Sequence, residues 1–133
     1  MPKIGSVDLN RAHESLNAAE LCLKESFVNS AASRAYYAMF QAAQVALEAE
    51  GLARTEWTHR GLHSSFNQDL IYRKKAYPRV FRNYLTSALT VRQAADHGEP
   101  GVSAKIAERQ VRRAKAFVET VKEVTSHGKP SKS

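Results

Sequence analysis

Arg92 and His97 are the residues of this sequence whose types and spacing best suit chemistry on a charged substrate. A guanidinium holds phosphate or carboxylate groups, and an imidazole titrates near neutral pH and can move protons. Asp96 follows Arg92 by four residues, where the two side chains can pair on one helix face. The order Arg then Asp is the weaker orientation for such a pair, and the acid lies at the negative end of the helix dipole. The placement therefore does not serve helix stability.

The segment that carries these residues has helical periodicity and ends at a Gly-Glu-Pro sequence. We expect a helix that stops at His97, with Gly98 in the left-handed conformation. On an ideal helix, Arg92 and His97 point roughly 140° apart. They can act on one target only if the helix loosens at His97 or if a second copy of the chain supplies the other half. The alternative is a surface Arg92–Asp96 ion pair beside a histidine that the helix dipole favours.

Positive charge is concentrated after residue 50. The net charge is +7, and residues 1–50 hold four basic and six acidic side chains, whereas residues 51–133 hold sixteen and seven. Such a field attracts polyanions, so nucleic acid is the partner class to test first, although solubility alone can produce the same balance. The densest group, here called the basic strip, consists of Arg73, Lys74, Lys75, Arg79 and Arg82. With tyrosine neighbours it suits an RNA backbone and unstacked bases, or a plain solvated face.

The remaining patterns argue against several classes of protein. No apolar run approaches the ~20 residues of a membrane helix and no signal peptide is evident, so we expect no membrane partner and a cytoplasmic location. No glycine-rich phosphate loop follows a strand. His59 and His63 share the spacing of metal ligands but have no third partner, so we expect no metal and no cofactor. Cys22 is expected to be a small buried side chain.

Five segments have helical periodicity, and none alternates as a strand does. We expect an all-α fold, an antiparallel four-helix up-and-down bundle with a short additional helix, in which residues 1–128 form one domain and residues 129–133 a flexible tail. The expected helices follow Asp8, run from Asn29 to Gly51, from Thr58 to Lys75, from Tyr77 to His97, and from Ser103 to near Gly128. The second is apolar almost all round and should be central, with Tyr36 and Tyr37 in the core.

Two stretches together resemble the HEPN domains (higher eukaryote and prokaryote nucleotide-binding), in particular small toxin-like and UPF0332-like prokaryotic members. Residues 30–43, Ser-Ala-Ala-Ser-Arg-Ala-Tyr-Tyr-Ala-Met-Phe-Gln-Ala-Ala, are similar to the second-helix signature of that family. Arg92 and His97 match its Arg-x(4–6)-His motif. The similarity extends from Asp8 to about Val124.

The resemblance implies a helical domain that forms a homodimer, with two Arg-x4-His motifs lining one cleft. Many such proteins are metal-independent endoribonucleases, often toxins paired with a minimal nucleotidyltransferase antitoxin. Carried onto this chain, His97 would activate the ribose 2′-hydroxyl or act as general acid, Arg92 would hold the phosphate, and Asp96 would orient either of them. The rival implication is a non-catalytic HEPN partner that binds a nucleotidyltransferase, nucleotide or RNA.

Two positions depart from the family pattern. Many relatives carry histidine where this chain has Gln41. In one toxin branch a tyrosine two residues after the motif histidine is the site that the antitoxin modifies, and this chain has Glu99 there. We therefore do not expect that form of neutralisation.

Overall fold

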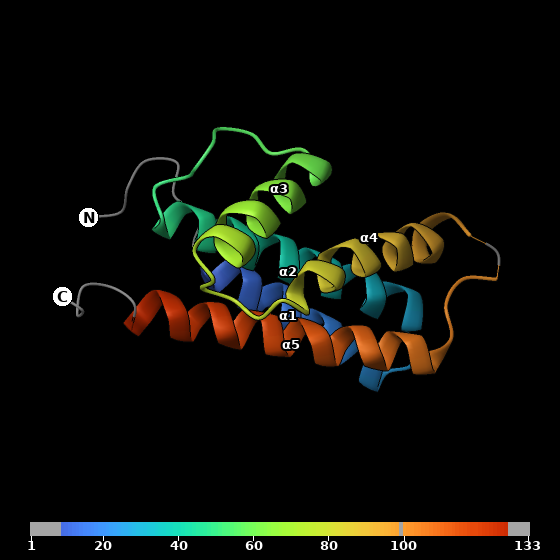
Figure 1. Cartoon of the computed structure of the whole chain (residues 1–133). Coiled ribbons are helices and arrows are strands. Elements are labelled where there is room, and N and C mark those ends of the chain that lie inside the picture. Colours follow the sequence, from blue (N-terminus) through green and yellow to red (C-terminus); the bar gives the residue numbers. More distant parts are fainter. Residues whose placement is uncertain (1–8, 99, 128–133) are drawn as a thin grey trace.

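The computed structural model describes residues 9–98 and 100–127, and in this part of the chain the regular elements are all helices, joined by turns and loops, without strands (Figure 1). The helices are α1 (Leu9–Lys24), α2 (Val28–Ala49), α3 (His59–Ser65), the π-helix η1 (Phe66–Arg73), α4 (Phe81–His97) and α5 (Ala104–His127). Four long helices and a shorter helical segment form a bundle, which confirms the predicted fold class. The predicted tail, the Asp8 cap and Gly128 lie outside the described residues.

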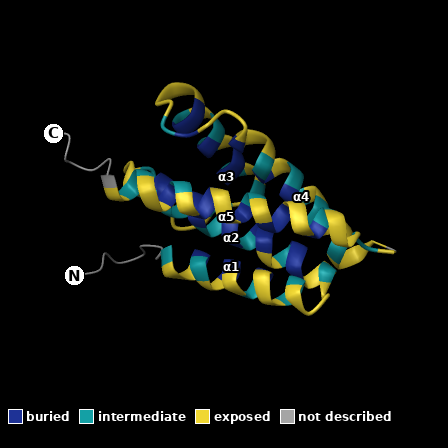
Figure 2. Cartoon of the chain, turned by 90° about the horizontal axis from the view of Figure 1, so that it is seen from below, coloured by how far each residue is buried: buried dark blue, intermediate teal, exposed yellow. Residues whose placement is uncertain are grey.

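Helix α2 is the centre of the bundle and packs against α1, α4 and α5. Its buried side chains are mostly small, so the neighbouring backbones can approach closely: Ala31, Ala32, Ala35, Ala38, Ala42, Ala43 and Ala46. Figure 2 shows the buried residues gathered where the helices face one another and the exposed ones on their outer faces. The predicted central position of this helix is therefore correct.

Local capping explains where two of the helices begin. The Thr58 side chain accepts a hydrogen bond from the Gly61 amide at 2.9 Å, and the Ser103 hydroxyl accepts one from the Ile106 amide at 3.2 Å. Both are side-chain N-caps, as the sequence predicts. After Ser65 the backbone continues from α3 directly into the wider turns of η1. The predicted short helix is therefore α-helical in its first half and π-helical in its second half.

An aromatic cluster holds the first turn of α4 against α5 and η1. The Phe81 ring lies 4.7 Å from that of Phe117, and Phe66 lies 5.2 Å from Phe117 and from Tyr77, measured between ring centroids. All four side chains are buried. This cluster fixes the start of α4, and the contact of α4 with α2 then directs its other end toward the beginning of α2.

Helix α4 ends at His97 as predicted, but the predicted left-handed conformation of Gly98 is wrong. Gly98 has φ −85° and ψ 159°, an extended conformation, and its amide donates to the Ala94 carbonyl at 2.8 Å. A Cβ at Gly98 would lie 2.8 Å from that same carbonyl oxygen, so close approach explains the glycine. The backbone is helical through His97 and does not loosen there.

The connection between α4 and α5 is attached to the start of α2. The Asn29 side chain accepts a hydrogen bond from the Val102 amide at 2.9 Å. Gly101 has φ +93°, and a Cβ there would lie 2.6 Å from the Asn29 side chain. Glycine is therefore required both by the backbone conformation and by the contact.

No helix in residues 9–98 and 100–127 combines the length and the apolar character that crossing a membrane requires.

Candidate functional site

Arg92 lies on the last turns of α4, half-buried, with 21% of its side chain exposed. Its Nε is 3.1 Å from Oδ2 of Asp96, so the predicted ion pair is present. The approach is not aligned as a hydrogen bond, and buried Nε has no hydrogen-bond partner among the described residues. The guanidinium is thus held in place while part of its donor capacity stays unused.

The ring of Tyr37, a residue of α2, packs against the guanidinium of Arg92. The Arg92 guanidinium carbon lies 5.0 Å from the centroid of the Tyr37 ring, and that of Arg34 lies 5.2 Å from the same centroid. Both distances are within the range of cation–π attraction. Two guanidinium groups therefore contact one ring, and Asp96 pairs with one of them, Arg92, which leaves a net positive charge. We call Arg34, Tyr37, Arg92 and Asp96 the Arg92 cluster.

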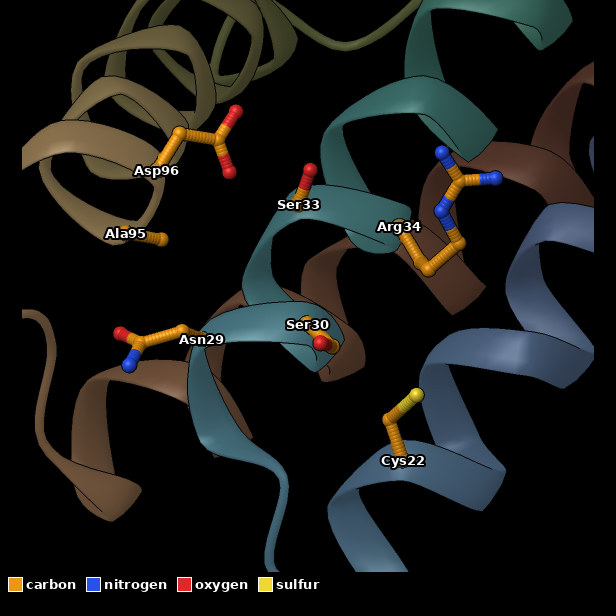
Figure 3. A pocket seen from close by; sticks show the side chains of 7 residues that line it. All are labelled: Cys22, Asn29, Ser30, Ser33, Arg34, Ala95 and Asp96. Atoms are coloured by element: carbon orange, nitrogen blue, oxygen red, sulfur yellow. The ribbon is translucent and has the colours of Figure 1, made fainter.

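A groove of about 540 Å³ opens beside the Arg92 cluster, between the end of α4 and the beginning of α2 (Figure 3). Asp96 is directed from α4 toward α2, and Arg34 and Ser33 come from α2. The lining is mostly polar and includes the following residues: Cys22, Asn29, Ser30, Ser33, Arg34, Ala95 and Asp96. Cys22 is half-buried at this groove and not fully buried as expected. The groove is large enough for a nucleotide-sized group.

His97 does not join this arrangement within one chain. Its side chain is exposed at the last residue of α4, and no hydrogen bond or ion pair joins it to another described residue. Because the helix is regular here, Arg92 and His97 point roughly 140° apart, as on an ideal helix. Of the three predicted catalytic residues, the structure brings Arg92 and Asp96 together and leaves His97 apart. Glu99 lies outside the described residues.

The basic strip lies at the opposite end of α4. Arg82 and Arg92 are ten residues apart on one helix, which corresponds to roughly 15 Å along its axis. Two members of the strip already have acidic partners, since Arg73 pairs with Asp69 and Lys74 with Glu50, each at 3.5 Å. Among the described residues, Lys75, Arg79 and Arg82 are the members of the strip without an ion pair.

Tyr72 is the aromatic neighbour of the strip. The Arg82 and Arg79 guanidinium carbons lie 5.6 Å and 6.0 Å from the centroid of its ring, and Arg82 also donates to its hydroxyl. Tyr72 is 41% exposed. The predicted association of arginine with an exposed aromatic ring is present here, on an open surface.

His59 and His63 lie on one face of α3, as predicted, and both contact the hydroxyl of Tyr36. The hydroxyl oxygen is 2.7 Å from Nδ1 of His59 and 3.0 Å from Nε2 of His63. Burial, and then the nearby His59, lowers the pKa of His63 to about 4. Burial, and then the positive charge of Arg92, lowers the pKa of His59, whereas burial raises the pKa of Tyr36. Among the described residues, no three potential metal ligands lie together.

Sequence reasoning missed the roles of Arg34, Tyr36 and Tyr37. The two tyrosines were expected to be core residues, and the Tyr36 ring is indeed fully buried, but its hydroxyl and the half-buried Tyr37 ring face polar groups. The available signal was the spacing of Arg34 and Tyr37, which places them on one face of α2. Gln41 continues that face and bonds to the Ser15 hydroxyl at 2.8 Å, so it joins α2 to α1.

A second basic surface was also missed. A groove of about 340 Å³ between α4 and α5 is lined by Tyr84, Arg109, Arg112 and Arg113. The Arg113 guanidinium carbon lies 5.0 Å from the centroid of the Tyr84 ring. The recurrence of arginine every three or four residues in the last helix was the signal that could have found it.

Comparison with known proteins identifies the family. The profile of the HEPN domain matches residues 7–124 of this chain. A UPF0332 protein of Thermotoga maritima is 33% identical over 89 residues, which cover 67% of this chain and 65% of that protein. The match therefore spans somewhat less than two thirds of the relative's own length. With a helical bundle, and with the Arg-x4-His motif at the end of its α4, the chain belongs to the HEPN domain family.

Proposed function

We propose that this protein is a metal-independent endoribonuclease of the HEPN type, and that Arg92 and His97 are its central catalytic residues. The observation that carries the proposal is the Arg92 cluster. It combines a half-buried guanidinium held by Asp96 with a second guanidinium on the same ring and an adjacent polar groove. A preorganised cation of this kind stabilises the charge that develops on a phosphate during cleavage.

The proposed site consists of two chains. Because Arg92 and His97 point apart on a regular helix, one chain presents them to different targets. In a homodimer in which two α4 ends face one cleft, Arg92 of one protomer would hold the phosphate while His97 of its partner serves as general acid. Asp96 would keep Arg92 oriented. Sedimentation that finds only monomer at micromolar concentrations contradicts this arrangement.

Sequence-independent contacts would come from the basic half of the chain. The basic strip and the groove between α4 and α5 both present arginine beside a tyrosine ring. Such pairs suit a phosphate backbone and stacked bases without base-specific recognition. RNA would therefore contact these surfaces for affinity and the Arg92 cluster for chemistry.

The test compares the wild type with Arg92→Ala and His97→Ala on RNA in excess chelator. We expect the wild type to cleave and each variant to lose at least about 100-fold in rate, with thermal melts as a control for folding. Equal cleavage by all three proteins, or cleavage that disappears with chelator, contradicts the proposal.

We further infer that the enzyme is the toxin of a toxin–antitoxin pair and that a minimal nucleotidyltransferase is its antitoxin. Expression of the wild type without a partner should then stop growth, while Arg92→Ala should be harmless. Because Glu99 occupies the position of the modified tyrosine in one toxin branch, neutralisation by modification at that position is not expected.

The second candidate function is a non-catalytic partner that binds a nucleotidyltransferase, nucleotide or RNA. Two observations favour it: Asp96 already neutralises part of the charge of Arg92, and His97 stands apart within one chain. In that case the purified wild type cuts no RNA, and Arg92→Ala loses binding to the partner while it remains folded.

A further inference from the structure

The Tyr36 hydroxyl joins two imidazoles into a hydrogen-bonded chain. It lies 2.7 Å from Nδ1 of His59 and 3.0 Å from Nε2 of His63. A phenol carries one hydrogen, so Tyr36 donates to one imidazole and must accept from the other. Consequently, the chain runs either from His59 through Tyr36 to His63 or in the reverse direction.

In this hydrogen-bonded series, Tyr36 and His63 are buried and His59 lies at the more accessible end. Tyr36 is fully buried and His63 is 8% exposed, whereas His59 is half-buried at the first residue of α3. The His59 ring packs 5.4 Å from the Tyr36 ring and 5.3 Å from the Phe40 ring, measured between centroids. These contacts fix its orientation. Because Nδ1 is engaged by Tyr36, Nε2 is the nitrogen that remains for a ligand.

His59 belongs to the same neighbourhood as Arg92. The Tyr36 ring lies 5.6 Å from the Tyr37 ring, and Tyr37 carries the Arg92 guanidinium at 5.0 Å. The titratable or charged groups that face His59 are Tyr36 from α2, His63 from its own helix and Arg92 from α4. No carboxylate of the described residues forms an ion pair with it. Burial and Arg92 both keep this imidazole neutral at physiological pH.

We propose that His59 is a catalytic residue that accepts the proton of the ribose 2′-hydroxyl through Nε2, with Tyr36 and His63 as positioning residues. This inference rests on the ribonuclease function proposed above. It supplies a proton acceptor on the same chain as Arg92 and leaves His97 the role of general acid.

The proposed step balances without metal or redox chemistry. The 2′-oxygen forms a bond to phosphorus, the bond from phosphorus to the 5′-oxygen breaks, and the 2′-hydroxyl proton passes to Nε2 of His59. A proton from His97 goes to the departing 5′-oxygen, so the products are a 2′,3′-cyclic phosphate and a 5′-hydroxyl. Nε2 of His59 can accept this proton only if Nδ1 of the same ring carries the hydrogen. In that tautomer Nδ1 donates a hydrogen bond to the Tyr36 hydroxyl, and the hydroxyl donates to Nε2 of His63.

The first test is His59→Asn, which keeps an amide group near the position of Nδ1 and removes Nε2. We expect the single-turnover rate at saturating RNA to fall at least about 100-fold, while the dissociation constant for RNA stays within about twofold. The matched control is His13→Asn, a half-buried histidine on α1, which should cleave like the wild type. If His59→Asn cleaves like the control, the inference is wrong although the proposed function stands.

A substrate with sulfur in place of the 5′-oxygen separates a base from an acid. A thiolate leaves without a proton, so the loss of a general acid is rescued on this substrate and the loss of a base is not. We expect His97→Ala to regain most of its rate and His59→Asn to remain impaired. Rescue of His59→Asn overturns its assignment as the base.

Tyr36→Phe tests the positioning role, because it keeps the ring and removes only the hydroxyl. We expect the single-turnover rate to fall about tenfold and the acid limb of the pH–rate profile to move. An unchanged rate and profile contradict the role of Tyr36. If the wild type cuts no RNA at all, it is the proposed function that fails, which is a different outcome from an active His59→Asn.

Discussion

Two tyrosine rings, one near each end of α4, each lie beside two guanidinium groups. Tyr37 lies between α2 and α4 and contacts Arg34 and Arg92, while Tyr72 lies on the open surface beside Arg79 and Arg82. The first ring is half-buried, and its neighbour Arg34 lines a groove, whereas the second ring is 41% exposed. Both regions combine one tyrosine with two arginines, so they differ in burial and in neighbouring residues and not in residue type.

The comparison shows why density of charge in the sequence is a poor guide to a site. The basic strip is the denser cluster, but it lies along one stretch of chain, and Arg73 and Lys74 are already paired with carboxylates. The Arg92 cluster draws its residues from two helices that are far apart in sequence, and the histidines of α3 lie next to it. Partial burial strengthens each electrostatic interaction there and holds the groups in fixed positions.

The matched pair Tyr37→Leu and Tyr72→Leu should separate the two regions most strongly. A partly desolvated cation–π contact contributes about 2 kcal/mol, which corresponds to roughly 30-fold in rate if it is needed in the transition state. We therefore expect Tyr37→Leu to lower cleavage about 30-fold, measured in single turnover, and Tyr72→Leu to change it less than about threefold. Equal losses would show that the two rings are equivalent.

Acid should destabilise the Arg92 end of the molecule through His63. Its pKa is about 4 in the folded protein and near 6.5 when unfolded, so the unfolded chain binds more protons between these values. Stability is therefore complete above about pH 6.5 and falls as the pH decreases toward 4, by roughly 1 to 3 kcal/mol in total. Urea melts of wild type and His63→Gln across this range measure it. A pH dependence that is identical in both proteins contradicts the assignment.

The basic strip should affect binding and leave chemistry unchanged. Arg79→Gln with Arg82→Gln is expected to weaken RNA binding several-fold at low salt and to reduce the slope of log affinity against log salt by about 0.7 for each lost phosphate contact. The cleavage rate at saturating RNA should stay the same. A rate that falls under saturation would place the strip at the chemical site instead.

The smallest effect is expected at the loop that follows α4. Asn29→Ala removes the hydrogen bond to the Val102 amide and should lower the free energy of unfolding by about 1 kcal/mol. Asn17→Ala, an exposed position on α1, is the control and should change stability by less than about 0.5 kcal/mol. Indistinguishable melts for the two variants would show that the loop is not held by Asn29.

The helices were predictable because their apolar positions repeat with helical spacing. The apolar residues on nearly every side of α2 predicted its central position, and Thr58 and Ser103 predicted the starts of two helices. The π-helical turns of η1 were not predictable, since Phe66, Leu70 and Ile71 fit an ordinary helical stripe equally well. The left-handed conformation predicted for Gly98 was wrong because a glycine after a helix has two possible reasons. It can adopt a positive φ, or, as here, it can leave room for a nearby backbone carbonyl.

The site was predictable only in part, for a related reason. Arg92 and Asp96 are neighbours along one helix, so their pairing follows from spacing. The contacts of Tyr36 and Tyr37 with His59 and Arg92 depend on how α2, α3 and α4 pack, which no local pattern encodes. Apolar neighbours indicated a core role for both tyrosines, and their polar atoms and ring faces became informative only in three dimensions.

The most direct test of the account is a comparison of Arg92→Ala with Arg82→Ala, two substitutions on one helix that remove the same charge. The measurement is single-turnover cleavage at saturating RNA in excess chelator, with folding checked by thermal melts. We expect Arg92→Ala to lose at least about 100-fold in rate and Arg82→Ala to stay within about threefold of the wild type. Equal rates for the two variants would contradict it.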